Sequence, residues 1–311
     1  MTFQTAMRFL NKKSVYALSA LSVLVGLGVG HAYPHNHTLC EGFVPENNVK
    51  IPVGAKYKWT LSNEAAGITE VQFNEVIDRA ERIFASKITE AGGTLQVNRK
   101  WTDPTVNASA QQFGTTWVVN MYGGLARHPA INVEGFALVV CHELGHHIGG
   151  APKIAGWYGS EWATNEGGAD YYATMKCLRE YFAEDDNAAI VAEKTIDAFA
   201  KTRCEEQFPN SEADKNVCLR MTLAGSSVAL LFQDLRDETT APAFNTPDPR
   251  QVNRMQDTHP ATQFRLDTYF NGATCTVSHT VPNSTTDWRA GSCIQGTDTY
   301  GWRPRCWFKG E

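Results

Sequence analysis

Apolar residues recur at helical spacing in a stretch that follows Thr69. Thr69 and Gln72 have the spacing of a capping box, and Gly92 and Gly93 end the stretch. The apolar residues that fall on one helical face are Val76, Ile77, Ala80, Ile83, Phe84 and Ile88. The pattern predicts an amphipathic helix between Thr69 and Gly92.

Two later segments alternate between apolar and polar residues. Residues 94–101 (TLQVNRKW) and 115–122 (TTWVVNMY) therefore predict strands. Asn132 is placed to cap a helix that ends at residues 149–152, and Ser160 to cap a further helix. The ends of the later helices are predicted at about residues 182, 206 and 236. This order of elements predicts an α+β protein, mostly helical, with a small sheet before the helix that follows Asn132.

The composition is that of a globular protein. Of the 311 residues, 42% are apolar and 20% are charged, and the net charge is −5. The sequence has no run of Lys and Arg, so we expect no nucleic-acid partner.

Residues 1–32 have the pattern of a signal peptide. The positive residues at its start are Arg8, Lys12 and Lys13. An apolar stretch over about residues 15–29 follows, and residues 30–32 (GHA) have the small residues of a cleavage site. We expect a secreted or periplasmic protein with no stable membrane span after signal cleavage. An uncleaved membrane anchor is the alternative.

All eight cysteines follow the predicted cleavage point, and an even number in an exported chain indicates disulfides. Cys204 and Cys218 would close a loop of about 15 residues, which the chain-entropy model values at about 3 kcal/mol. Residues 271–311 contain three cysteines, are rich in Gly, Ser, Thr and Trp, and lack helical periodicity. We therefore predict a main domain over residues 33–270 and a disulfide-braced C-terminal extension over residues 271–311.

The predicted helix around residues 139–150 (VVCHELGHHIGG) holds three histidines and a glutamate within six positions. His142 and His146 are four residues apart, so both imidazoles lie on one face and can bind one metal ion. Glu143 points about 100° away round the helix and can reach a water on that ion. His147 points away from this face, and we expect it to be a hydrogen-bonded structural histidine. A chance match to H-E-x-x-H is the alternative unless further site residues are present.

A catalytic zinc ion usually has three protein ligands and one open position. Glu166 supplies a third ligand, and Asp170 lies one helical turn further on the same face, where it can accept the second N–H of a ligand histidine. The small residues around them are Ala163, Gly167, Gly168, Ala169 and Ala173. They would let two helices approach closely, whereas a solvated acidic face, the alternative, would not need them. We expect one zinc ion (Zn²⁺) per chain, held by His142, His146 and Glu166.

With these residues the chain resembles the gluzincin metallopeptidases. The glutamate of NEGGAD follows the last histidine of HELGH by 20 residues, as in the thermolysin-type pair H-E-x-x-H and N-E-x-x-x-D. Residues 166–170 are also similar to the E-x-x-A-D motif of the HtpX and CAAX prenyl endopeptidase family. The V-N-A-x-A segment of residues 106–110 and the T-H-P-x-x-x-x-R segment of residues 258–265 match that family as well. The resemblance covers roughly residues 69–266 and implies a zincin-like fold, with residues 33–270 as a zinc metallopeptidase domain.

The resemblance also implies roles for residues outside the two zinc helices. The segment near Asn107 and Ala108 would be a sheet edge to which a peptide adds as a strand, bonded by the Asn107 amide and the Ala108 carbonyl. His259 is the candidate for stabilising the oxyanion, with a packing residue at a helix start as the alternative. Arg265 would brace the site through an acidic partner. HtpX-like proteins usually have a longer insert between the zinc helices and often several membrane spans. This chain would therefore be a soluble, exported relative, or an intermediate between the two groups.

The sequence thus predicts an exported zinc-dependent metalloendopeptidase that acts on peptide or protein substrates with a zinc-bound water and Glu143 as general base. Two alternatives stay open. One is an exported zinc hydrolase of cell-wall peptides, and the other is an inactive zinc-binding protein of the same fold.

If the two zinc helices run antiparallel, as the gluzincin resemblance implies, Cys141 and Cys177 are too far apart for a disulfide. Cys177 lies eleven residues beyond Glu166, about 16 Å along the helix, whereas Cys141 lies at most about 8 Å from the level of the ligands. A disulfide needs Cα atoms within about 7 Å. We therefore expect Cys141 to be a buried thiol or to pair elsewhere, and Cys177 to be free to pair with Cys204 or Cys218.

Overall fold

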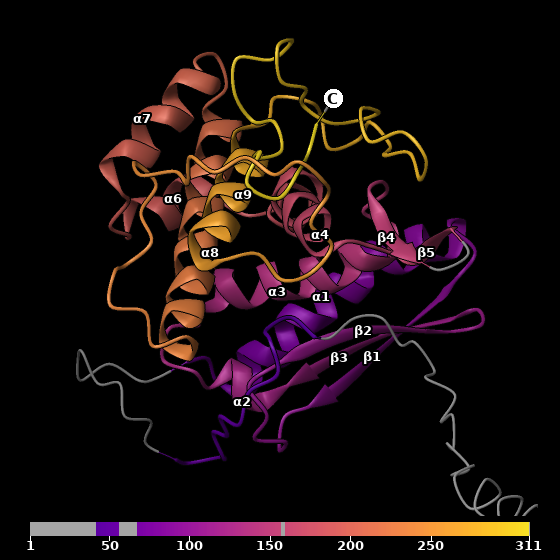
Figure 1. Cartoon of the computed structure of the whole chain (residues 1–311). Coiled ribbons are helices and arrows are strands. Elements are labelled where there is room, and N and C mark those ends of the chain that lie inside the picture. The colour runs from indigo at the N-terminus through magenta and orange to yellow at the C-terminus, as the bar shows by residue number, and fades with distance from the viewer. Residues whose placement is uncertain (1–41, 56–66, 157–158, 311) are drawn as a thin grey trace, which may run out of the picture. The chain divides into compact units, whose positions relative to one another are not determined.

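A three-stranded sheet lies beneath the helices of the molecule (Figure 1). The computed structural model describes residues 42–55, 67–156 and 159–310, all of which belong to the unit formed by residues 38–311. The strands are β1 (Thr94–Lys100), β2 (Ala108–Phe113) and β3 (Thr116–Tyr122). β3 lies in the middle, parallel to β1 and antiparallel to β2, so β2 forms one edge of this sheet. Strands β1 and β3 confirm the two strands that alternation predicted.

Helices α1 (Glu70–Glu90) and α3 (Val133–Ile148) pack against each other and on the sheet. α1 begins with the predicted capping box, in which Thr69 and Gln72 each bind the backbone N–H of the other. α3 begins after its predicted cap, Asn132, and every residue from Glu134 to His147 is buried. Such burial on all sides requires that other elements cover the face of α3 that the sheet and α1 leave open.

A second group of helices covers that face of α3 (Figure 1). α4 (Glu166–Tyr172) and α8 (Glu212–Leu235) pack on α3, and α9 (Thr262–Thr274) packs on both. The π-helical turn η1 (Ala173–Cys177) continues α4 into α5 (Leu178–Tyr181). The remaining elements are α2 (Gly123–Ala126), β4 (Lys153–Gly156), β5 (Gly159–Thr164), α6 (Asn187–Ala192) and α7 (Ala198–Gln207). The fold is α+β as predicted, and its main apolar core runs along α3.

The start of α4 differs from the prediction. A helix was expected from Ser160, but residues 159–164 form β5, which pairs antiparallel with β4. The helix begins at Glu166 because the Asn165 side chain accepts a hydrogen bond from the Gly168 N–H and caps it. Gly168 therefore lies in the first turn of α4 rather than in a helix interior, where it would be costly.

The expectation that Cys141 and Cys177 do not pair is wrong. These residues form a disulfide, with their Cα atoms 5.6 Å apart. The two helices nevertheless run in opposite directions. Gly145 packs on Ala169. Cys141 precedes Gly145 in α3, and its partner follows Ala169 along the second helix.

The distance argument failed because it placed the two helices level at Glu166. In the structure Gly145 of the first helix lies level with Ala169, three residues after Glu166. Glu166 still meets the histidines because its side chain points back toward them. The π-helical turn has more residues per turn than an α-helix, which shortens the path to Cys177 further. The other predicted loop closure, between Cys204 and Cys218, is confirmed.

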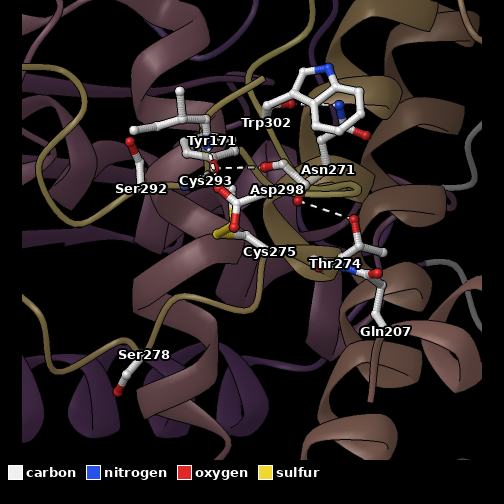
Figure 2. Close-up of a disulfide and its surroundings, with 12 residues drawn as sticks. Tyr171, Gln207, Asn271, Thr274, Cys275, Ser278, Ser292, Cys293, Asp298 and Trp302 are labelled. Atoms are coloured by element: carbon white, nitrogen blue, oxygen red, sulfur yellow. Dashed lines mark hydrogen bonds between the residues drawn. A yellow bond between two sulfur atoms is a disulfide. The ribbon is translucent and has the colours of Figure 1, made fainter. Parts of the chain in front are cut away.

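The segment after α9 packs on the rest of the unit and is braced by a disulfide between Cys275 and Cys293. Figure 2 shows Tyr171 of α4 beside this bond. The Tyr171 hydroxyl accepts from the Cys293 N–H at 3.3 Å and donates to the Gly301 carbonyl at 2.6 Å. Tyr171 thus joins the C-terminal extension to the helix that begins with Glu166.

The boundary predicted at residue 271 falls inside α9. The Asn271 side chain donates to the Trp302 carbonyl at 2.6 Å, so the end of α9 is bound to the extension that follows it (Figure 2). Cys306 is buried and has no disulfide partner among the described residues, which do not include Cys40.

No helix within residues 42–55, 67–156 and 159–310 is long and apolar enough to cross a membrane. The predicted signal peptide, residues 1–32, lies outside these ranges.

Candidate metal centre

Two histidines of α3 bring their imidazole nitrogens together. His142 Nε2 and His146 Nε2 lie 3.0 Å apart, and both side chains are completely buried. The helix places residues four apart on one face. That face lies close to α4 because Gly145 has no side chain: an added Cβ would be 3.1 Å from the Ala169 Cα. Close contact between the two helices therefore positions the pair.

Glu166, the first residue of α4, directs its carboxylate toward both histidines. Its Oε2 atom lies 3.4 Å from His142 Nε2, and its Oε1 atom lies 3.6 Å from His146 Nε2. One ligand atom from each of the three residues lies within 4.8 Å of the others. Among the described residues, this is the one group of three or more His, Cys, Asp or Glu side chains with such spacing.

Hydrogen bonds at the other ring nitrogens determine what the two Nε2 atoms can bind. His146 Nδ1 lies 2.8 Å from the Thr164 carbonyl oxygen, which can only accept, so Nδ1 carries the proton. His142 Nδ1 donates to Asp170 Oδ1 at 2.7 Å. In neutral rings both Nε2 atoms then carry lone pairs, which face each other and the Glu166 carboxylate. This donor set fits a zinc ion, whose ligand atoms, about 2.0–2.2 Å from the metal, stand about 3.4 Å apart in a tetrahedron.

Asp170 belongs to a buried hydrogen-bond network behind the histidines. Its Oδ1 atom also accepts from Arg265 Nη2 at 2.7 Å and from the Tyr269 hydroxyl at 2.9 Å. Its Oδ2 atom accepts from Arg265 Nε at 2.8 Å. These side chains are at most 1% exposed. The network holds His142 in one orientation, because a buried bidentate ion pair leaves its carboxylate no freedom to turn.

Neighbouring basic groups oppose the effect of burial on the pKa values of these carboxyl groups. Burial by itself raises the pKa of Asp170, but Arg265 and His142 lower it below its ordinary value. Burial likewise raises the pKa of Glu166, and His259, His146 and His142 together lower it. Both carboxylates are therefore ionised near neutral pH and can accept hydrogen bonds or bind a cation.

Trp307 of the C-terminal extension packs against the first turn of α4, which carries Glu166. Trp307 is completely buried, and an added Cβ at Gly167 would lie 2.2 Å from its ring. Trp307 Nε1 donates to Thr268 Oγ1 of α9 at 2.8 Å. Gly167 therefore makes room for Trp307, and it does not serve the helix–helix approach that the sequence suggested for it.

His259, Asn107 and Ala108 border one backbone segment, and His259 also lies beside the candidate metal centre. His259 Nε2 is 3.6 Å from Glu166 Oε2, and burial is the main cause that lowers the pKa of His259 below its ordinary value. Asn107 and Ala108 stand at the start of the edge strand β2. All three residues form hydrogen bonds with the backbone of residues 42–44. Nothing in the sequence pattern pointed to that segment.

His147 is a structural histidine, as predicted. Its ring stacks between Trp117 and Trp162, and its Nε2 donates to the Val118 carbonyl at 3.2 Å. Burial lowers the pKa of His147 to about 3, so the ring is neutral. Glu143, on the same helix, is completely buried.

Sequence reasoning also missed two groups that orient the ligands. The Thr164 carbonyl, at the end of β5, holds His146, and the Tyr269 hydroxyl holds Asp170. A backbone carbonyl has no sequence signal. No pattern in the sequence marks Tyr269 either, because its partner is determined by the packing of α9.

Comparisons of the chain with protein-family models, with curated proteins and with solved structures find no match. The geometry of the centre is therefore the basis for inferring a function.

Proposed function

We propose that this protein is an exported zinc-dependent metalloendopeptidase that hydrolyses peptide or protein substrates. One observation carries the proposal: two histidine lone pairs and the Glu166 carboxylate converge, while both histidine Nδ1 protons are held by acceptors. A set of two histidines and one glutamate is a known catalytic zinc site, which keeps a fourth position open.

Zinc in such a site supplies a Lewis acid that lowers the pKa of a bound water to about 7. Glu143 follows the ligand His142 and is the candidate general base. Its carboxylate would take the proton from the attacking water and pass it to the amine nitrogen as the peptide bond breaks. Water thereby adds across the amide, which yields a carboxylate and an amine.

His259 is the candidate for binding the carbonyl oxygen on which negative charge develops. Its Nε2 carries a proton, because it donates to a carbonyl oxygen, that of Gly42, at 2.5 Å. A donor positioned in this way is worth about 3–4 kcal/mol, or two to three decades in rate. The Asn107 amide and the Ala108 carbonyl, at the edge of the sheet, would bind the substrate backbone.

The proposal is tested with two variants of the full chain, Glu143→Gln and Glu166→Ala. The amide of Glu143→Gln is similar in size but cannot accept a proton, so we expect one zinc ion per chain and a loss of hydrolysis of about a hundredfold or more. Glu166→Ala should lose most of its zinc, because only two of the three proposed protein ligands remain. Zinc is measured by metal analysis, and hydrolysis by release of fragments from casein, with and without chelator.

Glu205→Gln serves as the matched control, because it makes the same chemical change at a partly exposed helix position remote from the histidines. Unchanged hydrolysis in Glu143→Gln would exclude this residue as the base. Stoichiometric zinc in Glu166→Ala would exclude this residue as a ligand. Zinc uptake with no hydrolysis, either by the native chain or after residues 42–44 are displaced from beside the histidines, would identify an inactive zinc-binding protein. Cleavage of peptidoglycan peptides but not of casein would identify a cell-wall hydrolase.

A further inference from the structure

The backbone of residues 42–44 is bonded to the candidate site at one polar group after another. The Gly42 carbonyl accepts from His259 Nε2 at 2.5 Å. The Phe43 N–H donates to the Ala108 carbonyl at 2.8 Å, and the Phe43 carbonyl accepts from Arg265 Nη1 at 2.6 Å. The segment is thus held by the groups that the proposed function assigns to a substrate, and by Arg265 behind them.

The next residue is bonded in the same way. The Val44 N–H donates to Asn107 Oδ1 at 3.1 Å, and the Val44 carbonyl accepts from Asn107 Nδ2 at 3.3 Å. Five consecutive backbone groups, from the Gly42 carbonyl to the Val44 carbonyl, are therefore satisfied. Hydrogen bonds of this kind bind a peptide backbone whatever its side chains are.

The Phe43 side chain fills an apolar space against the metal centre. It is completely buried, and its ring centre lies 4.8 Å from that of His142 and 5.3 Å from that of Phe232. The Arg265 guanidinium lies over the same ring, 4.5 Å from its centre. A bound peptide with an aromatic side chain at this position would make the same contacts.

The segment is anchored separately further along the chain. Ile51 donates to the Pro104 carbonyl, and Lys50 pairs antiparallel with Thr105. Between this anchor and Val44 the side chains at positions 46 and 48 are exposed, whereas Asn47 Nδ2 donates to the Val106 carbonyl at 3.2 Å and Val49 packs on the core. The anchor from Asn47 to Ile51 does not use the bonds of residues 42–44, so those residues can leave the site while the anchor stays in place.

We propose that residues 42–44 occupy the position of a bound peptide, so that this conformation is a closed form and a substrate binds only after the segment leaves. The inference rests on the proposed function, because that function defines the peptide position. It also accounts for the complete burial of His142, Glu143 and His146, which a substrate would have to reach.

Gly42 offers a specific way to loosen the segment. Its φ is +95°, and an added Cβ would lie 2.6 Å from Asn107 Nδ2 and 3.0 Å from the Ala108 carbonyl oxygen. Gly42→Ala therefore presses the segment away from the groups that hold it. Gly54 has a similar φ of +76° but no heavy atom within 4 Å of an added Cβ, so Gly54→Ala is the matched control for backbone strain alone.

The test uses a dye-labelled peptide, EGFVPE, capped at both ends, which copies residues 41–46. All proteins carry Glu143→Gln, so that hydrolysis cannot consume the probe, and binding is followed by fluorescence anisotropy in buffer with zinc. We expect Gly42→Ala to bind the probe at least about tenfold more tightly than the protein with Gly42, and Gly54→Ala to bind it like that protein. Equal affinities in all three proteins, or no binding to any of them, would overturn the inference.

A second measurement needs no change at Gly42, so it tests the same proposal even if Gly42→Ala does not fold. Hydrogen exchange at the Phe43 and Val44 amides should speed up when the probe saturates the protein, because probe and segment compete for one place. Probe binding with unchanged protection of these amides would overturn the inference. Neither measurement depends on turnover. If probe and segment compete but Gly42→Ala with native Glu143 hydrolyses nothing, the proposed function fails, although residues 42–44 still occupy a position at which a peptide binds.

Discussion

Replacing Asp170 by Asn should disrupt the hydrogen-bond network that orients His142. The two side chains are nearly equal in size, so packing should not change. The carboxylate accepts four hydrogen bonds: three at Oδ1, from His142, Arg265 and Tyr269, and one at Oδ2, from Arg265 Nε. An amide has one oxygen, which keeps most bonds if it takes the Oδ1 position. Its NH₂ group then faces the Arg265 Nε–H across 2.8 Å, donor against donor.

The magnitude follows from the burial of Arg265. Loss of one charge-assisted hydrogen bond costs about 1.5–3 kcal/mol. Removing one partner of a buried ion pair costs about 3–5 kcal/mol in total, because the remaining charge is uncompensated. Both side chains are 0% exposed, so solvent cannot take over the lost interaction. We expect the free energy of unfolding to fall by about 4 kcal/mol, and zinc affinity to fall about tenfold to a hundredfold because His142 loses its charged acceptor.

Unfolding is measured with guanidinium chloride at pH 7 in the presence of chelator and with the disulfides intact, and zinc affinity by competition with a chromophoric chelator. Glu205→Gln removes an exposed carboxylate paired with Lys201 and should leave both quantities unchanged. A loss of stability below about 1 kcal/mol in Asp170→Asn would refute the account of the buried pair. Unchanged zinc affinity would refute the role of Asp170 in orienting His142.

Three further predictions concern other parts of the chain. Burial raises the pKa of Asp267 from 3.8 to about 6, so the folded state keeps this proton where the unfolded chain has lost it. Denaturation at several pH values should show wild type losing about 3 kcal/mol relative to Asp267→Asn between pH 3 and pH 7, and a difference independent of pH would contradict this. Replacing Cys141 and Cys177 together by Ser opens a loop with a sequence separation of 36 and should cost about 4 kcal/mol by the chain-entropy model. A cost within error of zero in denaturation experiments would show that this disulfide does not stabilise the fold. Mass spectrometry of the exported protein should find Tyr33 at the N-terminus, and export with residues 1–32 retained would instead support a membrane anchor.

The sequence determined those features that depend on residues a few positions apart. The capping box at Thr69, the cap at Asn132 and the alternation of β1 and β3 are local, because a cap or a strand face involves neighbours within about four residues. The pairing of His142 with His146 is equally local, since one helical turn separates them. These features do not depend on which other segments pack around them.

Packing between distant segments decided the rest. The pairing of β5 with β4 displaced the predicted helix start from Ser160, and the contact of Gly145 with Ala169 set the helix register that brings Cys141 and Cys177 together. Residues 42–44 are held beside the candidate metal centre by hydrogen bonds that span 63 to 222 positions of the chain. No periodicity or cap encodes such contacts, because they depend on how helices and strands fit against one another after they form. The tertiary structure alone therefore showed that this chain places its own backbone beside the histidines its sequence had already paired.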